Sequence, residues 1–344
     1  MIMAEDLQQQ LRRTRKKSKR RRRRGPNRVL RKSAYYAVLT AYHLARITPM
    51  WALGGFVRAV ANLAFLVLTK RRRIAIDNIR HALGDDLGYW RVLNLARRSF
   101  ESFLLAPPEL IKHRSQLLRA DAREWMLRRY PDLGPVFQKV KDIHEASGGC
   151  IFVTPHFGNW ELLPFVSAAF GIPTVIPVRP LDNPYLEQFV YAGRAQSGQI
   201  FVPNRNSLHT LQQRLDQGDS VGLLPDQSTK RGLLVEFFGR PALTTPIPAT
   251  LAIMQQRPIV VIACYRTGRL RFDGYASDPI WPRPGQDQRQ ETERLCLAMN
   301  REMEKIIRLH PEQYFWMHNR WKRYQQTSRR ERRGENEKRI SNID

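Results

Sequence analysis

The chain has little cysteine and lacks the motifs that cysteine usually marks. Its three cysteines, Cys150, Cys264 and Cys296, are odd in number, and no two have the spacing of a metal site or redox motif. This excludes a disulfide framework and is typical of a reducing compartment. We therefore expect no metal and no cofactor. We also expect no secretory signal, because the basic N-terminal stretch is too long and too charged for the weak apolar run behind it.

Acidic residues are the second shortage. The 344 residues include 31 Asp and Glu against 58 Lys and Arg, which leaves a formal net charge of +27. Fourteen of the basic residues lie between positions 12 and 32, with an unbroken run at 19–24. We interpret residues 1–33 as a basic, disordered arm. Such an excess favours anionic partners: phospholipid headgroups, phosphorylated substrates, an acidic carrier protein or nucleic acid.

Nucleic acid is the least favoured of these partners. No helix-turn-helix, zinc-finger or aromatic stacking motif accompanies the arm in the sequence. We expect the arm to bind an anionic membrane surface instead, at about 1 kcal/mol per basic residue near the headgroups. Deletion of residues 1–33 would then weaken liposome binding at moderate salt.

Residues 34–69 form the most apolar part of the chain. The stretch 47–69 carries a single charge, Arg58, and is long enough to span a bilayer. Pro49, the paired glycines at 54–55 and basic clusters at both ends argue against a span. We expect a membrane-associated helix lying in the inner leaflet. A true span and a buried helix of a soluble fold remain the alternatives.

The remaining chain predicts an α/β domain over 70–325 and a polar tail over 326–344. Residues 74–146 have a helical pattern. Beyond them, short apolar runs of strand type occur at 149–153, 173–178, 199–202, 220–224 and 259–265. Helical segments are expected at 161–170, 183–197, 207–217, 250–255 and 289–309. Strands separated by helices indicate a largely parallel sheet covered on both faces.

The strongest chemical signal is a histidine and an acid five positions apart, His156 and Glu161. With eight histidines in the chain, about one such pair is expected by chance, and His81 with Asp86 is a second. Their contexts differ, because His81 lies where a helix runs into a turn. His156 directly follows a predicted strand, and ligand sites of open α/β sheets lie beyond the carboxyl ends of strands.

This position predicts acid–base chemistry at His156. A hydroxyl becomes a useful nucleophile only when a base removes its proton during attack, and imidazole titrates near neutral pH. We expect Glu161 to accept a hydrogen bond from the other ring nitrogen and to stabilise the imidazolium. No serine or cysteine nucleophile is required if an activated acyl donor meets the hydroxyl directly. The alternative is a loop histidine with a surface glutamate nearby.

Five sequence blocks, in order, resemble the lipid A biosynthesis (lauroyl/myristoyl) acyltransferase family, which is related to the glycerol-phosphate acyltransferases. The first, at 154–162, is similar to the family's H-x4-D/E motif. The others lie at 177–184, 224–227, 237–242 and 311–322. The resemblance implies a mixed sheet wrapped by helices, and His156 as base with Glu161 as its partner. It also implies an acyl-carrier-protein or acyl-CoA donor, a lipid hydroxyl acceptor, and attachment to the cytoplasmic face of a bacterial inner membrane.

Three further residues are candidates for substrate binding. Arg179, in the family's Arg-Pro block, and Arg194 suit phosphate or carboxylate, because guanidinium is planar and permanently charged. Asp226 follows a predicted strand and is either an acceptor-site residue or a cap. His318 is favoured as structural. The acceptor stays open between a lipid A precursor and another lipid: a phosphatidylinositol mannoside, glycerol-phosphate or an ornithine lipid.

Overall fold

The computed structural model describes residues 28–84, 86–229 and 232–322. The predicted tail at 326–344 and most of the predicted arm lie outside these residues. The last part of the arm, 28–33, is the beginning of a helix. Arginine and lysine are good helix formers, which accounts for a helix that extends into a basic stretch.

The helices are listed here in chain order. They are α2 (Arg28–Ile47), α3 (Met50–Val67), α4 (Thr69–Leu83), α5 (Tyr89–Leu117), α6 (Ala122–Arg129), α7 (Leu133–Ser147), the 3-10 turn η2 (Trp160–Leu162), α8 (Leu163–Ala169), α9 (Pro184–Ala195), α10 (Leu208–Asp216), α11 (Ile247–Gln255), α12 (Gln288–Leu309) and the 3-10 turn η3 (Pro311–Gln313). The helical segments expected after residue 160 all occur, with ends shifted by a few residues.

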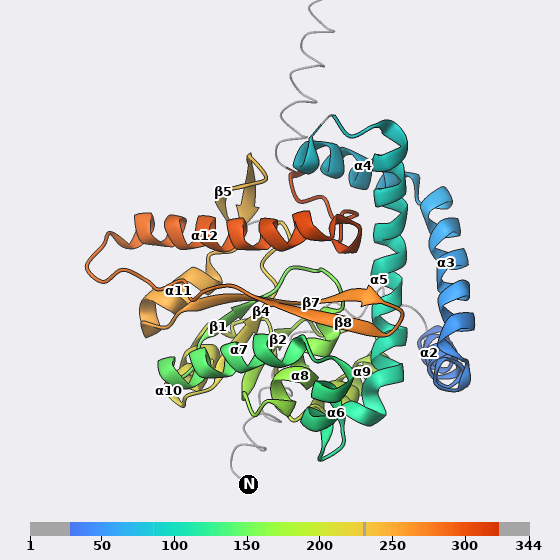
Figure 1. Cartoon of the computed structure of the whole chain (residues 1–344), viewed down its shortest axis with the longest axis horizontal. Coiled ribbons are helices and arrows are strands. Elements are labelled where there is room, and N and C mark those ends of the chain that lie inside the picture. The colour runs from blue at the N-terminus through green and yellow to red at the C-terminus, as the bar shows by residue number, and fades with distance from the viewer. Residues whose placement is uncertain (1–27, 85, 230–231, 323–344) are drawn as a thin grey trace, which may run out of the picture.

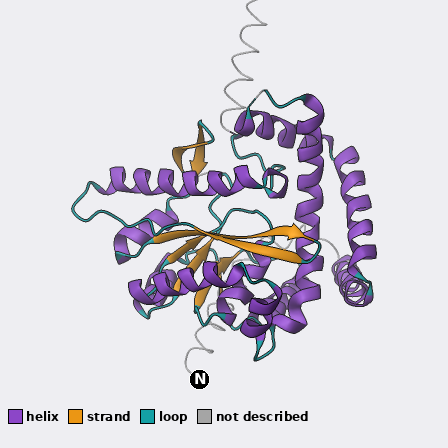
Figure 2. Cartoon of the chain, viewed as in Figure 1, coloured by secondary structure: helices purple, strands orange, loops and turns teal. Residues whose placement is uncertain are grey.

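A six-stranded sheet forms the centre of the molecule (Figure 2). Its strands are β1 (Ile151–Val153), β2 (Thr174–Val178), β3 (Ile200–Pro203), β4 (Ser220–Leu223), β7 (Ile259–Gly268) and β8 (Arg271–Ala276). Their order is β3-β2-β4-β1-β7-β8, and every pair is parallel except β7 with β8. The predicted mixed, largely parallel α/β sheet is therefore confirmed. The antiparallel strand β8 was not predicted.

Both faces of the sheet are buried, which explains the unbroken apolar runs of its central strands. In β1, Ile151 and Val153 point into one core, shared with α5, α11 and α12, whereas Phe152 points into the other, shared with α6, α7 and α8. Figure 1 shows α11 and α12 on one side of the sheet and α7 and α8 on the opposite side. Helix α5 stands across the edge of this sandwich.

A separate two-stranded hairpin, β5 (Leu233–Phe237) with β6 (Arg240–Thr244), packs against α12. Its two-residue loop consists of Phe238 at φ +50° and Gly239 at φ +74°. Positive φ at both loop positions matches the right-handed twist of the strands that it joins. The family-like block at 237–242 is this turn and the strand that follows it.

The apolar segment expected as one membrane helix is divided into α2 and α3 at Pro49. By length and composition alone, α3 is the one helix in the described residues that could cross a membrane, with mean hydropathy 1.6 and 22% of its residues buried. One side of α3 packs on α5, where Arg58 pairs with Glu101 at 2.9 Å. The other side is exposed and apolar, as is much of α2.

Candidate active site

The register between the neighbouring strands β1 and β4 brings His156 and Asp226 together. In the parallel pair β1–β4, Val153 lies opposite Leu223. His156 and Asp226 each follow three residues beyond these positions, so the two loops emerge side by side at the carboxyl edge of the sheet. This is the edge at which open α/β sheets bind ligands.

His156 is held by both oxygens of Asp226. Its ring Nδ1 lies 2.6 Å from Oδ1, and its backbone N–H donates to Oδ2 at 2.8 Å. The Asp226 side chain is 2% exposed and the His156 side chain 18% exposed. Because Nδ1 donates to the carboxylate, Nε2 carries the lone pair. Nε2 faces the amide of the exposed residue Gln227, whose Nε2 lies 3.2 Å away.

The Nδ1 hydrogen bond that we expected for Glu161 is therefore made by Asp226. Glu161 lies on η2, and its Oε1 accepts from the guanidinium of Arg194 on α9 at 2.8 Å. A spacing of five residues brings Glu161 near His156 but does not fix the direction of its side chain. Residues 161 and 194, both predicted as site residues, thus form one ion pair beside the histidine.

These contacts set the charges of His156 and Asp226, here called the central pair. Burial alone would lower the pKa of His156, but the charge and hydrogen bond of Asp226, with a smaller contribution from Glu161, raise it above its ordinary value. Burial would raise the pKa of Asp226, yet His156 and the nearby Arg320 hold it below its ordinary value. Asp226 is consequently an anion at neutral pH, placed to stabilise a protonated His156 ring.

Aromatic rings line the approach to the imidazole. Trp160 lies 5.2 Å and Phe315 6.1 Å from the His156 ring, between ring centroids. Phe103 on α5 stacks on Phe315 at 4.5 Å and on Trp160 at 5.8 Å. The three rings are partly exposed, so an apolar wall adjoins the accessible ring nitrogen.

The loop that carries His156 is fixed by its backbone. Phe315 N donates to the carbonyl of His156 at 3.0 Å, and Phe157 pairs with Tyr314 in an antiparallel bridge. Gly158 has φ +60°, and a Cβ there would lie 2.1 Å from the carbonyl oxygen of Cys264. Glycine is therefore required where the turn passes under β7.

Arg179 directly follows β2, two strands from β1 in the sheet order. Strand spacing places the ends of these strands about 10 Å apart. Arg179 is exposed, and within the described part of the chain we find no ion-pair partner for it.

His318 lies close to the central pair, with its Nε2 accepting from the backbone N–H of Ser228 at 3.0 Å.

Sequence comparison gives the family. The sequence profile of the bacterial lipid A biosynthesis acyltransferases matches residues 21–323. The chain belongs to this family. It is 28% identical to a lipid A biosynthesis lauroyltransferase of Escherichia coli (strain K12) over 191 aligned residues. The aligned region covers 54% of this chain and 60% of the relative. It is 27% identical over 179 residues to the palmitoleoyltransferase of the same organism, 51% of this chain and 56% of the relative. The chain thus spans less than two thirds of either relative.

Several site residues of this acyltransferase-family chain were not predicted from the sequence. Phe103 lies 53 residues before His156, in a helix that carries no motif. Gln227 and Phe315 lie inside blocks that resemble the family, but nothing in those blocks indicates that they face the histidine. Asp226 was singled out because it follows a strand, whereas its bond to His156 depends on the β1–β4 register, which the sequence does not reveal.

Proposed function

We propose that the chain is an O-acyltransferase in which His156 is the general base. The observation that carries this proposal is the geometry of its ring: Nδ1 is bound to a buried carboxylate while Nε2 faces an exposed side chain at the carboxyl edge of the sheet. In this tautomer the accessible nitrogen is the basic one. Membership of the acyltransferase family supports the same reaction class.

The reaction begins when Nε2 takes the proton of an acceptor hydroxyl as its oxygen attacks the carbonyl carbon of an acyl thioester. The tetrahedral intermediate then expels the thiolate, which receives the proton from His156, so that an ester and a free thiol are formed. Asp226 stabilises the imidazolium between these steps. Glu161, paired with Arg194, adds negative charge beside the ring. The donor is an acyl carrier protein or CoA thioester, and Arg179 is proposed to bind its phosphate.

The proposed acceptor is a membrane lipid, such as a lipid A precursor, at the cytoplasmic face of a bacterial inner membrane. Supporting this, α3 exposes a row of large apolar side chains on the side away from α5: Trp51, Phe56, Val60, Leu63, Leu66 and Val67. Four basic residues, 70–73, follow directly in α4. An apolar surface next to a basic one suits the interface of an anionic bilayer.

Acyl transfer by purified protein in liposomes tests the proposal. A labelled acyl carrier protein thioester, or acyl-CoA, is supplied with a panel of lipid acceptors, and products are followed by mass spectrometry. We expect transfer by the wild type and losses of roughly 100- to 10,000-fold in His156→Ala and Asp226→Asn. We also expect a large loss in Glu161→Ala. Full transfer by folded His156→Ala would overturn the mechanism, and failure of the wild type to acylate any lipid of the panel would overturn the proposed substrate class.

A further inference from the structure

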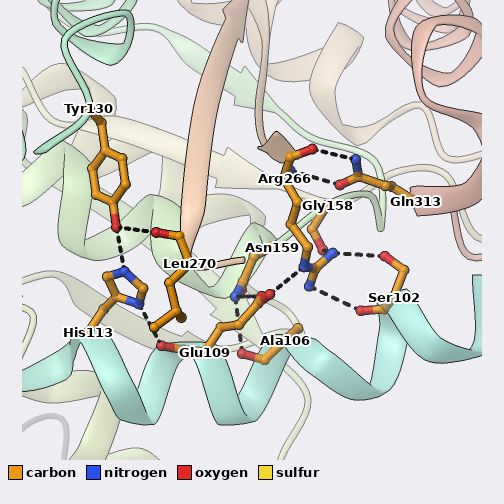
Figure 3. Close-up of polar contacts among 10 residues, drawn as sticks. All are labelled: Ser102, Ala106, Glu109, His113, Tyr130, Gly158, Asn159, Arg266, Leu270 and Gln313. Atoms are coloured by element: carbon orange, nitrogen blue, oxygen red, sulfur yellow. Dashed lines mark hydrogen bonds and ion pairs between the residues drawn. The ribbon is translucent and has the colours of Figure 1, made fainter. Parts of the chain in front are cut away.

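A buried ion pair of Arg266 and Glu109 contacts Gly158 and Asn159, in the turn that follows His156 (Figure 3). Arg266 on β7 and Glu109 on α5 approach to 2.6 Å, with side chains 11% and 3% exposed. The two residues are 157 positions apart in the chain. A buried ion pair does little for stability beyond what well-packed apolar residues would provide, so its presence raises the question of what else it does.

The Arg266 guanidinium reaches the loop directly. Besides Nε to Glu109, one terminal nitrogen donates to the carbonyl of Gly158 at 3.0 Å and to the hydroxyl of Ser102 at 2.8 Å. The other terminal nitrogen donates to the carbonyl of Ser102 at 3.1 Å. A rigid planar group thus joins the turn after His156 to helix α5.

Glu109 holds the next residue of the same turn. Its second oxygen accepts from Asn159 Nδ2 at 2.9 Å, and the same amide donates to the carbonyl of Ala106 at 3.1 Å. Asn159 is fully buried, and its backbone N–H donates to the carbonyl of Cys264 at 2.8 Å. One ion pair therefore fixes two consecutive residues, 158 and 159, which lie between His156 and Glu161.

The pair is itself anchored from two sides. Gln313 bridges the backbone of Arg266, accepting from its N–H at 2.8 Å and donating to its carbonyl at 2.9 Å. The carbonyl of Gln313 accepts from Gly158 N–H at 3.1 Å. On α5, His113 Nδ1 lies 2.9 Å from the Glu109 carbonyl, and its Nε2 contacts the Tyr130 hydroxyl. Burial lowers the pKa of His113, so the ring is neutral and Nδ1–H donates to that carbonyl.

We propose that Arg266 and Glu109 are positioning residues for acyl transfer, because together they set the direction of the turn that separates His156 from Glu161. This inference rests on the proposed function. An apolar pair of the same volume would fill the space but could not bind a carbonyl and an amide in fixed directions. A shift of about 1 Å at the base can cost roughly 100-fold in rate. In this proposal the ion pair acts through the loop, because both side chains are largely buried and bind residues 158 and 159.

Four variants separate positioning from stability. Arg266→Lys keeps the charge but loses the planar set of donors, and Glu109→Gln leaves the guanidinium without its counter-charge. The double variant Glu109→Gln with Arg266→Gln removes both charges. Arg214→Lys is the matched control. Arg214 pairs with the largely buried Asp219 at 2.6 Å, immediately before β4 and thus at the amino ends of the parallel strands, opposite the carboxyl ends that His156 follows.

Each variant is measured in three ways: the unfolding midpoint, hydrogen exchange of the peptide covering 154–161, and kcat and KM with the thioester donor. In Arg266→Lys and Glu109→Gln we expect exchange of 154–161 to accelerate while β1 stays protected. We expect kcat to fall about 10- to 100-fold with KM changed less than about threefold. The double variant should regain most of the midpoint lost by Glu109→Gln but not its kcat. Arg214→Lys should keep wild-type kcat and exchange at 154–161.

The possible results have separate meanings. If the double variant regains kcat together with the midpoint, or if exchange at 154–161 is unchanged in Arg266→Lys, the ion pair is only structural and the inference is overturned. If the wild type transfers no acyl chain to any lipid, the proposed function fails. Hydrogen exchange then still decides whether Arg266 and Glu109 hold the loop.

Discussion

Nδ1 of His156 lies 2.6 Å from Oδ1 of Asp226, and the other oxygen of the same carboxylate accepts from the backbone N–H of His156 at 2.8 Å. Ring and backbone are thus bound by one side chain, located 70 residues later in the chain. Glu161, only five residues away from His156, is turned toward Arg194. The structure separates the two carboxylates, one in contact with the ring and one acting through its charge.

This difference gives the first prediction. In Asp226→Asn the acid limb of the pH–rate profile should move to lower pH, because the charge and hydrogen bond that raise the pKa of His156 are lost. In Glu161→Gln the limb should move in the same direction by a smaller amount, since Glu161 contributes only a lesser charge effect. Profiles of kcat/KM, with the wild type as reference, measure both shifts. A larger shift in Glu161→Gln would show that Glu161 is the partner of His156 during turnover.

The second prediction concerns the wild-type pH dependence. A base must be unprotonated, so activity should rise with pH through the raised pKa of His156, above the ordinary value of about 6.5. Stability should behave differently. The raised pKa of His156 means that its contribution to folding is complete below its unfolded-state pKa and lost as pH rises through the folded-state value. The lowered pKa of Asp226 means that its contribution is lost only as pH falls through that depressed value.

Equilibrium unfolding at a series of pH values measures the predicted pH dependence of stability. Comparison of the wild type with Asp226→Asn isolates the contribution of the His156–Asp226 pair. The free energy of unfolding of the wild type should exceed that of the variant most between the lowered pKa of Asp226 and the raised pKa of His156. A difference that is constant with pH would contradict the charge pair.

The third prediction uses two glycines that share a positive φ. Gly158→Ala should lower the free energy of unfolding by about 3 kcal/mol or more, because the new Cβ would meet the Cys264 carbonyl at 2.1 Å. Gly171→Ala should cost about 1 kcal/mol, because its φ is +72° but no atom lies within 4 Å of the added methyl. Denaturant unfolding measures both. Equal losses would mean that only the backbone conformation matters at Gly158.

The fourth prediction tests the exposed face of α3. Phe56 and Leu63 are 66% and 62% exposed and lie seven residues apart, on one side of the helix. The double variant Phe56→Glu with Leu63→Glu should weaken binding to anionic liposomes about 10- to 100-fold, because two apolar side chains no longer enter the bilayer. Sedimentation with liposomes gives the partition constant.

Trp281→Glu provides the control for this prediction. Trp281 is 48% exposed and lies between β8 and α12, outside the apolar surface of α2 and α3. Its substitution should leave liposome binding unchanged. Equal weakening in both variants would indicate a general effect of charge rather than a membrane-binding face.

The sequence predicted well the part of the fold in which strands alternate with helices. The runs at 173–178 and 220–224 differ from β2 and β4 by a single residue at one end, because strands buried on both faces are continuously apolar. Strand β8 was missed for the converse reason. Its burial alternates and it carries Arg271, Asp273 and Gly274, so no apolar run marks it.

The candidate site was predicted only in part. A histidine that directly follows a buried strand is visible in the sequence, because the carboxyl end of a strand is defined by local pattern. Contacts between distant segments are not visible in this way. Asp226 meets His156 through strand register, and Arg266 meets Glu109 because the tertiary fold brings this part of β7 within side-chain reach of α5. Neither residue type nor spacing carries that information.

The distances along the chain between these partners have a consequence for biosynthesis. The loop of His156 needs Glu109 from before it, Asp226 and Arg266 from after it, and Gln313 close to the last described residues. Closing such long loops is slow and comes late in folding. A nascent chain that has emerged from the ribosome only as far as β4 therefore has its histidine but no assembled site. Under the function proposed above, thioester consumption should begin only after η3 has been translated, and products truncated before η3 should consume no acyl donor.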